Sequence, residues 1–362
     1  MRDNQSTSQI AKARVVTQMI GVRHSLGVGE IVEHLGAVQA QDYLGALWAL
    51  GVRIPGATER TVENAIAERT LVRTWPMRGT LHFVPAMDIR WMLDLLTPRV
   101  IARNAGRYHE LELTAEIFGR ARDVVERALG SAERLTRPAV SDCLTRAGID
   151  TTGARGLHIL GFLAQQGVIC FGPREGKQHT FVLIDEWVPN ARRLTREESL
   201  AELARRYFTS HGPATLRDFV WWCGLPVRDA REAVELNGGR LRCDLVSETR
   251  HFRALRPPSR SGAARDAHLL PAFDELIVAY RDRSAVVDAT YMRRLGAGGV
   301  MWPSIVLGSR AVGTWRRELT GTAVRIRLEP FVSLTREKRT AIETAARRYG
   351  SFLERTADWQ WA

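Results

Sequence analysis

Two glutamines, Gln39 and Gln41, stand two residues apart in the stretch Val38–Asp42, between an apolar helical segment and the start of another helix. A glutamine amide donates and accepts hydrogen bonds, so two of them can hold a water molecule in a defined position. An amide cannot serve as a general base near neutral pH, which limits the pair to reactions that need a positioned water. The alternative is an ordinary pair of capping or solvent-exposed side chains.

The spacing of the two glutamines predicts the backbone that must carry them. Residues two apart do not face each other on a helix, whereas in an extended segment they point to the same side. We therefore expect Gln39 and Gln41 on a non-helical link between two helices. Asp42 is the nearest carboxylate, and its favoured interpretation is the N-cap of the next helix, with catalytic support as the alternative. His82, on a predicted strand, is a second supporting candidate, although a strand histidine with satisfied hydrogen bonds is favoured.

Short helices followed by strands are expected to position these residues. The order of helices and then a hairpin occurs twice, and a third round of helices ends in a single predicted strand. Such an order is typical of winged helices, a variant of the helix-turn-helix. In the first round we predict helices at 10–20, 29–38, 43–50 and 61–68 and strands at 71–75 and 79–84. The second has helices at 114–129, 137–147 and 155–166 and strands at 168–171 and 179–184, and the third has helices at 196–211, 215–223 and 227–236 and a strand at 239–246.

The periodicity changes after a Pro- and Ser-rich stretch at 256–262, which is typical of a linker or exposed loop. Short strands are predicted at 304–307, 311–318 and 323–328, and an amphipathic helix at 335–353 closes the chain. The expected fold class is α+β, with tandem winged-helix units followed by a small C-terminal β-barrel-like domain. The expected domains are 1–110 with the glutamine turn, 111–195, 196–255, and 256–362 with the closing helix.

The charge favours an anionic partner. The chain has 362 residues and a formal net charge of +12, and arginine carries nearly all of its positive charge, because lysine occurs only at Lys12, Lys177 and Lys338. Arginine presents a planar fork of donors that suits phosphate and guanine edges. A surface of this kind favours nucleic acid or an anionic membrane. The alternative is an arginine-rich composition that only solvates exposed faces.

Cofactor, metal and membrane signals are not found in the sequence. The cysteines Cys143, Cys170, Cys223 and Cys243 lack zinc-site spacing, and there is no glycine-rich phosphate loop or His-Cys cluster. No apolar stretch approaches the roughly 18 residues of a membrane helix, and the first residues are polar. We expect a reduced, cytoplasmic, nucleoid-associated and monomeric protein without metal or cofactor.

Five segments that together span most of the chain carry a resemblance. They are Val38–Asp42, Arg73–His82, Cys170–Pro173 with Gly176-Lys177, Leu270–Glu275 and Val312–Arg317. Their combination, which is more specific than the Gln-Ala-Gln turn alone, resembles the winged-helix DNA glycosylase family. This family includes the bacterial azinomycin-resistance glycosylase and cross-link-repair relatives.

The resemblance implies tandem winged helices with a β-barrel and hydrolysis of the N-glycosidic bond of alkylated purines in double-stranded DNA. It places catalysis on Gln39 and Gln41. Relatives carry either two glutamines or a glutamine and an aspartate in this turn, and Gln41 makes this chain resemble the azinomycin-resistance side. An N7-alkylated guanine is cationic and leaves as a neutral base, so one positioned water could suffice, and bulky adducts and interstrand cross-links become candidate substrates.

DNA is expected to be held mostly through phosphates. The candidate contacts are Arg73, Arg78, Arg174, Lys177, Arg281, Arg283, Arg316 and Arg317. No lysine lies near the glutamine turn, so we expect a monofunctional glycosylase without a Schiff-base step. The alternatives are a non-enzymatic winged-helix transcriptional regulator and an architectural DNA-binding protein, because a fold alone does not decide function.

Overall fold

The computed structural model describes residues 2–246, 248–256 and 266–362. Most of the predicted linker at 256–262 lies outside the described residues. The contacts group the chain into two compact units. We call Met1–Val62 together with Leu200–Ala362 the first unit, and Glu63–Ser199 the second unit. The finer division into four domains stays a prediction.

The second unit is built from helices and an antiparallel sheet. Its helices are η1 (Ala86–Asp88), α5 (Ile89–Arg103), α6 (Ala105–Glu110), α7 (Ala115–Gly130), α8 (Arg137–Arg146), α9 (Arg155–Gln165) and α10 (Ile184–Trp187), and α4 (Glu59–Ala67) crosses into it. Its strands are β2 (Leu71–Met77), β3 (Thr80–Pro85), β4 (Leu135–Thr136), β5 (Ile169–Phe171) and β6 (Thr180–Leu183). Within the unit they follow the order β3-β2-β5-β6-β4.

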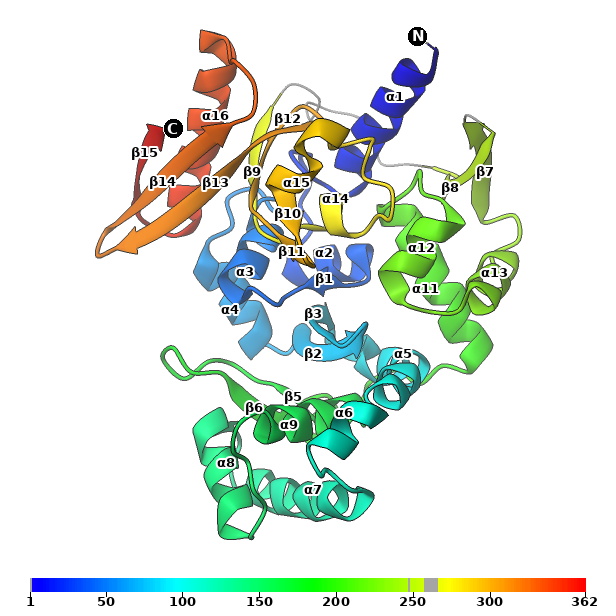
Figure 1. Cartoon of the computed structure of the whole chain (residues 1–362), viewed down its shortest axis with the longest axis vertical. Helices are drawn as coiled ribbons and strands as arrows, with labels where there is room; N and C mark the ends of the chain where they lie inside the picture. Colours follow the sequence, from blue (N-terminus) through cyan, green and yellow to red (C-terminus); the bar gives the residue numbers. More distant parts are fainter. Residues whose placement is uncertain (1, 247, 257–265) are drawn as a thin grey trace. The chain divides into compact units, whose positions relative to one another are not determined.

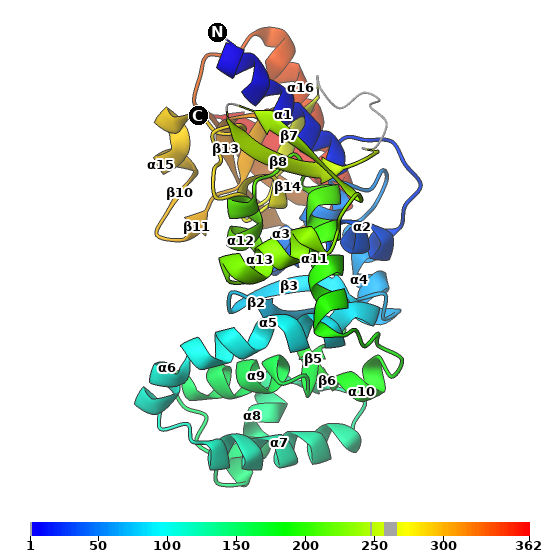
Figure 2. The same cartoon turned by 90° about the vertical axis from the view of Figure 1, so that its right-hand side faces the viewer.

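An aromatic core fills the space between this sheet and helices α7 to α9, which Figure 2 shows grouped beside β5 and β6. The rings of Phe118 and Phe162 stack with centroids 3.8 Å apart. Phe171 lies 5.1 Å from Trp75 and 4.7 Å from Phe181, centroid to centroid. Trp75 of the Arg73–His82 segment is therefore part of this core.

Helices of the first unit come from both ends of the chain. They are α1 (Arg2–Thr17), α2 (Val28–Leu35), α3 (Tyr43–Gly51), α11 (Arg196–Ser210), α12 (Leu216–Cys223), α13 (Val227–Glu235), α14 (Glu275–Val278), η2 (Ala289–Tyr291), α15 (Met292–Leu295) and α16 (Arg336–Phe352). No helix in the described part of the chain is long and apolar enough to span a membrane.

Apart from the two-residue β1, the strands of the first unit form one large sheet and two hairpins. The sheet has the order β15-β14-β13-β12-β9, and the hairpins are β7-β8 and β10-β11. In the described residues the large sheet is open, with β15 and β9 at its edges, so the predicted barrel-like arrangement is not observed. The strands are β1 (Val38–Gln39), β7 (Leu241–Val246), β8 (Thr249–Ala254), β9 (Ala267–Leu270), β10 (Gly296–Ala297), β11 (Val300–Met301), β12 (Ser304–Leu307), β13 (Arg310–Thr320), β14 (Ala323–Pro330) and β15 (Thr356–Trp361).

Helix α16 packs against this sheet and α3, as Figure 1 shows. The ring of Tyr349 lies 5.0 Å from that of Trp48 and 4.9 Å from that of Trp315. The two indole N–H groups donate to strand β9: Trp48 to the Leu269 carbonyl at 2.6 Å and Trp315 to the Leu270 carbonyl at 2.7 Å. Two buried tryptophans thus anchor the end of β9, from which the chain continues towards Glu275.

Every predicted helix and strand is present, most of them with shifted ends, and the mixed helix and strand content is confirmed. Helix-rich segments precede β2-β3, β5-β6 and β7-β8 in chain order, but the winged-helix interpretation itself stays a prediction. Several elements were not predicted, among them α5, the second hairpin strand β8 and the edge strands β9 and β15. Strand β15 pairs with β14 in parallel, with Trp359 opposite Ile326.

Candidate active site

Gln39 and Gln41 lie on a non-helical link, as their spacing predicts. Helix α2 ends before Gly36, whose positive φ of 79° reverses the chain and favours glycine. The link is then extended at β1 and bends at Gln41 and Asp42 before α3 begins at Tyr43. Burial alternates along it: Ala40 is fully buried, whereas Gln39 is half-buried and Gln41 exposed. Gln39 and Gln41 are therefore the more accessible residues on either side of the buried Ala40.

Asp42 forms the predicted N-cap of α3. Its Oδ1 accepts a hydrogen bond from the Gly45 N–H at 3.1 Å. A Cβ atom at Gly45 would stand 2.4 Å from Asp42 Oδ2, so the cap requires glycine there. Arg317 also reaches this carboxylate, with its NH2 group 3.5 Å from Oδ1, while its NH1 group donates to the Tyr349 hydroxyl at 2.9 Å. Asp42 therefore joins the turn to both α3 and the C-terminal sheet.

A buried glutamate, Glu275, is hydrogen-bonded to the backbone of the turn. The N–H of Gln39 donates to Oε1 of Glu275 at 3.0 Å. The indole N–H of Trp222 donates to the other oxygen, Oε2, also at 3.0 Å. Nε2 of His211 lies 3.4 Å from the same oxygen. Burial lowers the pKa of His211, and the nearby Glu275 carboxylate offsets part of this effect. Glu275 itself is only 1% exposed.

Asp274, the neighbour of Glu275, forms a fully buried ion pair. Its two oxygens accept from NH1 and NH2 of Arg53 at 2.8 and 2.9 Å. Arg53 donates its other three hydrogens to the carbonyls of Gln18 and Ala49 and to the Gln18 side chain. All five guanidinium N–H groups are thus used. Asp274 Oδ1 also caps α14 through the Leu276 N–H.

Asp274 and Glu275 belong to a segment that resembles the glycosylase family, but the sequence predicted no role for either residue. The only local signal is a pair of acids just before the apolar run Leu276–Val278, which indicates a helix start. Their contacts with Arg53 and Gln39 span more than 200 residues of sequence, so the local pattern does not reveal them.

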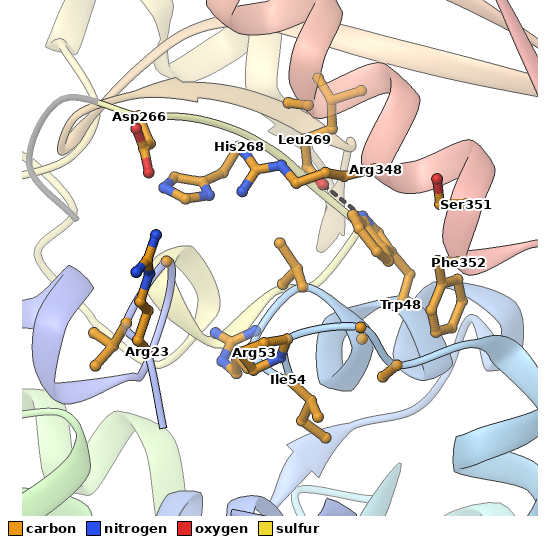
Figure 3. A pocket seen from close by; sticks show the side chains of 18 residues that line it. Arg23, Trp48, Arg53, Ile54, Asp266, His268, Leu269, Arg348, Ser351 and Phe352 are labelled. Atoms are coloured by element: carbon orange, nitrogen blue, oxygen red, sulfur yellow. Dashed lines mark hydrogen bonds between the residues drawn. The ribbon is translucent and has the colours of Figure 1, made fainter. Parts of the chain in front are cut away.

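A cavity of about 410 Å³ opens in the same unit between 21–23, 51–57, the start of β9 and α16 (Figure 3). Its lining includes Arg53 but neither glutamine. His268 projects towards it from β9, with Arg348 alongside. Burial, followed by the charge of Arg348, lowers the pKa of His268 to about 3. Neither ring nitrogen of His268 has a hydrogen-bond partner among the described residues. Arg53, which pairs with Asp274, therefore lines the cavity, whereas Gln39 and Gln41 do not.

Candidate DNA contacts of the first unit differ in accessibility. Arg281 and Arg316 are exposed, and the side chain of Arg316 is 71% accessible. Arg283 is half-buried: its Nε donates to the Ile277 carbonyl at 3.0 Å, and burial lowers its pKa. Arg316 and Arg317 line a groove of about 530 Å³ over β13, β14 and β15.

Two of the candidate DNA contacts in the second unit, Arg73 and Arg174, interact with other side chains of the protein. Arg73 is buried, with its guanidinium carbon 4.7 Å above the ring of Phe171, which argues against direct phosphate contact. Arg174 pairs with Glu63, and Lys177 is exposed.

His82 lies in the second unit with its side chain fully buried. Its Nδ1 lies 3.0 Å from the Thr80 carbonyl and its Nε2 3.2 Å from NH2 of Arg78. Both ring nitrogens are occupied, which supports the structural interpretation of His82. The contact with Nε2 also means that Arg78, at the hairpin turn, has a partner within the protein.

The described residues contain no group of three or more His, Cys, Asp or Glu side chains that could hold a metal ion. A family model described as DNA glycosylase AlkZ-like matches residues 32–352, which include both glutamines and Glu275. The chain belongs to the AlkZ-like DNA glycosylase family.

Two relatives of this AlkZ-like glycosylase agree with the assignment. An interstrand DNA cross-link repair glycosylase from Streptomyces sahachiroi is 23% identical, over 86% of this chain and 87% of that protein. The solved structure of Streptomyces sahachiroi DNA glycosylase AlkZ superposes with a TM-score of 0.75 at 22% identity and covers 100% of both chains. At this identity the structural likeness shows that the two share a fold.

Proposed function

We propose that this AlkZ-like DNA glycosylase hydrolyses the N-glycosidic bond of N7-alkylated purines in double-stranded DNA. Bulky adducts and interstrand cross-links are included among its substrates. The enzyme is a monofunctional hydrolase that acts as a monomer in the cytoplasm, associated with the nucleoid. The family assignment supports the glycosylase over a transcriptional regulator, and the name of the Streptomyces sahachiroi relative supports cross-links as substrates.

The observation that carries the proposal is the non-helical link on which the half-buried Gln39 and the exposed Gln41 flank the buried Ala40. Two amides on one side of a short link can hold one water through donor and acceptor groups together. Asp42 is engaged by the Gly45 N–H and by Arg317, so its carboxylate serves the turn's structure. The water is therefore assigned to Gln39 and Gln41.

The chemistry suits a site without a strong base. An N7-alkylated purine carries a positive charge that disappears when the glycosidic bond breaks, so the departing base is neutral. The sugar develops oxocarbenium character, as in other glycoside hydrolysis. A water fixed near the anomeric carbon then adds to the sugar, and its proton passes to solvent. Positioning supplies the rate through proximity, and no proton acceptor on the turn is needed.

The enzyme would accept adducts of different sizes if the positioned water reaches the sugar without the base being enclosed in a pocket. Enzymes that act on bases usually flip the base into a tight pocket. An interstrand cross-link ties the base to the opposite strand and opposes such flipping. We therefore propose an open site that does not enclose the base. Cleavage of 7-methylguanine alone, with no bulky adduct accepted, would contradict the open site.

Base release from duplex DNA tests the proposal. One substrate carries 7-methylguanine and a second carries a nitrogen-mustard cross-link, and wild type is compared with Gln39→Ala and Gln41→Ala. Gln9→Ala, which removes an exposed glutamine of α1, is the matched control. We expect abasic product from wild type and Gln9→Ala, and its loss in both turn variants with DNA binding retained. DNA binding by wild type without base release from either substrate would reject the proposed activity.

A further inference from the structure

We infer that Glu275 is a positioning residue for catalysis and sets the direction of the Gln39 side chain by holding its backbone N–H. The inference rests on the proposed function of the glutamine turn. Glu275 does not face the substrate side, because it is buried and bonded to the turn's backbone. Its effect on the reaction passes through Gln39.

Each oxygen of the Glu275 carboxylate has its own partner, which prevents the group from rotating. Oε1 accepts from Gln39, and Oε2 accepts from the Trp222 indole and lies beside His211. A rigid carboxylate therefore gives the Gln39 backbone one preferred position.

The elements around Glu275 keep the carboxylate itself in place. Trp48 and Trp315 anchor the end of β9, five residues before Glu275, through the carbonyls of Leu269 and Leu270. The buried pair of Asp274 with Arg53 then holds the start of α14. The position of Gln39 is thereby tied to the sheet and to α3.

The short strand that carries Gln39 explains why such a clamp is needed. Strand β1 has only two residues, and the link continues through a bend to α3. A link of this length has little regular structure of its own to define the direction of its side chains. A misplacement of about 1 Å in a reacting group can cost about a hundredfold in rate. A clamp on the Gln39 N–H thus acts where catalysis is most sensitive to backbone position.

Loss of the carboxylate should therefore slow base release without weakening DNA binding. In Glu275→Ala we expect single-turnover base release to fall about 10- to 100-fold. The dissociation constant for DNA should stay within about twofold, because Glu275 is only 1% exposed and presents almost no surface to DNA. Glu275→Gln keeps an acceptor for Gln39 but presents an amide N–H group to the Trp222 indole, so its rate should lie between those of Glu275→Ala and wild type.

Hydrogen exchange separates positioning from a general loss of stability. Exchange over 38–42 should accelerate in Glu275→Ala and less in Glu275→Gln. The control is Ile342→Ala, which truncates a fully buried side chain of α16 away from the turn, assayed at a temperature where folding is complete. This control should lower the melting temperature while leaving both base release and exchange over 38–42 as in wild type.

Three results would overturn the inference: a Glu275→Ala rate equal to that of Ile342→Ala, a slow rate with unchanged exchange over 38–42, or no recovery in Glu275→Gln. If Glu275→Ala does not fold, Glu275→Gln carries the test, and wild-type rate and exchange in that variant reject the clamp. Full activity in Gln39→Ala would instead reject the proposed function. If base release is lost in Gln39→Ala but stays at the wild-type rate in Glu275→Ala, only the role of Glu275 is rejected.

Discussion

The buried pair of Arg53 and Asp274 makes a strong prediction for stability. Both side chains are 0% exposed, and two hydrogen bonds of 2.8 and 2.9 Å join them. Asp274→Ala would leave the Arg53 guanidinium buried without a counter-charge. It would also remove the acceptor that caps α14 through Leu276. We therefore expect this substitution to destabilise the first unit strongly.

The magnitude follows from the two losses. Removing one partner of a buried ion pair costs about 3–5 kcal/mol, because the remaining charge is left uncompensated. Removing an N-cap adds about 1 kcal/mol. The expected loss of about 4–6 kcal/mol is a large part of the roughly 5–15 kcal/mol by which folded proteins are stable. The Asp274→Ala protein should thus be only marginally folded in this unit at room temperature.

Replacing both partners removes the buried charge but leaves other buried acceptors without a donor. In Arg53→Met with Asp274→Leu no charge stays buried. The carbonyls of Gln18 and Ala49 and the side-chain oxygen of Gln18, which accept from Arg53, would lose those donors. Each such acceptor costs about 1–3 kcal/mol when buried, and the lost cap of α14 adds about 1 kcal/mol. The double variant is therefore expected to lose roughly 4–10 kcal/mol, which is less than the sum of the two single losses because no charge stays buried alone.

Urea unfolding at pH 7 followed by circular dichroism would measure these free energies. Arg60→Ala is the control, because its pair with Glu354 is 3.6 Å long with side chains 75% and 54% exposed. Exposed pairs contribute about 0–1 kcal/mol. A loss below about 1 kcal/mol in Asp274→Ala, no larger than in the control, would refute the reasoning from a buried charge.

Two further predictions concern pH and salt. Burial lowers the pKa of His268 from 6.5 to about 3. Between these two pH values the unfolded chain binds a proton on this residue and the folded chain does not. The free energy of unfolding is therefore highest above pH 6.5 and falls as the pH is lowered towards 3. Urea unfolding at several pH values should give a slope of about 1.4 kcal/mol per pH unit from this group, and His268→Asn should remove that share; an unchanged slope would contradict it. Arg281→Ala and Arg283→Ala should weaken DNA binding and reduce the salt slope by about 0.9 for each phosphate that the protein no longer neutralises. Fluorescence anisotropy over a salt series would measure this, and unchanged affinity and slope would count against both arginines as phosphate ligands.

The glutamine turn could be predicted because its signals are local. The residue spacing predicts an extended link, and Asp42 before an apolar run predicts the cap, and both are observed. Helix α5 was missed because Pro98 lies inside it, where proline normally interrupts a helical pattern. Its Thr97 hydroxyl lies 2.8 Å from the carbonyl oxygens of both Leu93 and Gln165, and the contact with Gln165 is one that sequence periodicity does not reveal.

Glu275 could not be assigned from sequence for a different reason. It is separated from Gln39 by 236 residues, and its carboxylate contacts β1 and α12, which lie far from it in the sequence. A carboxylate in a sequence is expected on the surface, because burial without partners is costly. Only the structure supplies the partners, Gln39 and Trp222, that make the burial tolerable. The barrel-like expectation failed similarly, since short alternating strands predict a sheet but not whether its edges join.

Arginine richness does not translate directly into a DNA-binding surface here. Arg14, Arg53, Arg73 and Arg206 are each at most 5% exposed and serve internal contacts. Arg53 shows why arginine is suited to this task, because only a planar fork of five donors could join Gln18, Ala49 and Asp274 at once. Part of the net charge of +12 therefore stabilises the fold. Substitutions that probe DNA binding should accordingly begin with exposed arginines such as Arg281, because loss of a buried one would reduce binding through unfolding.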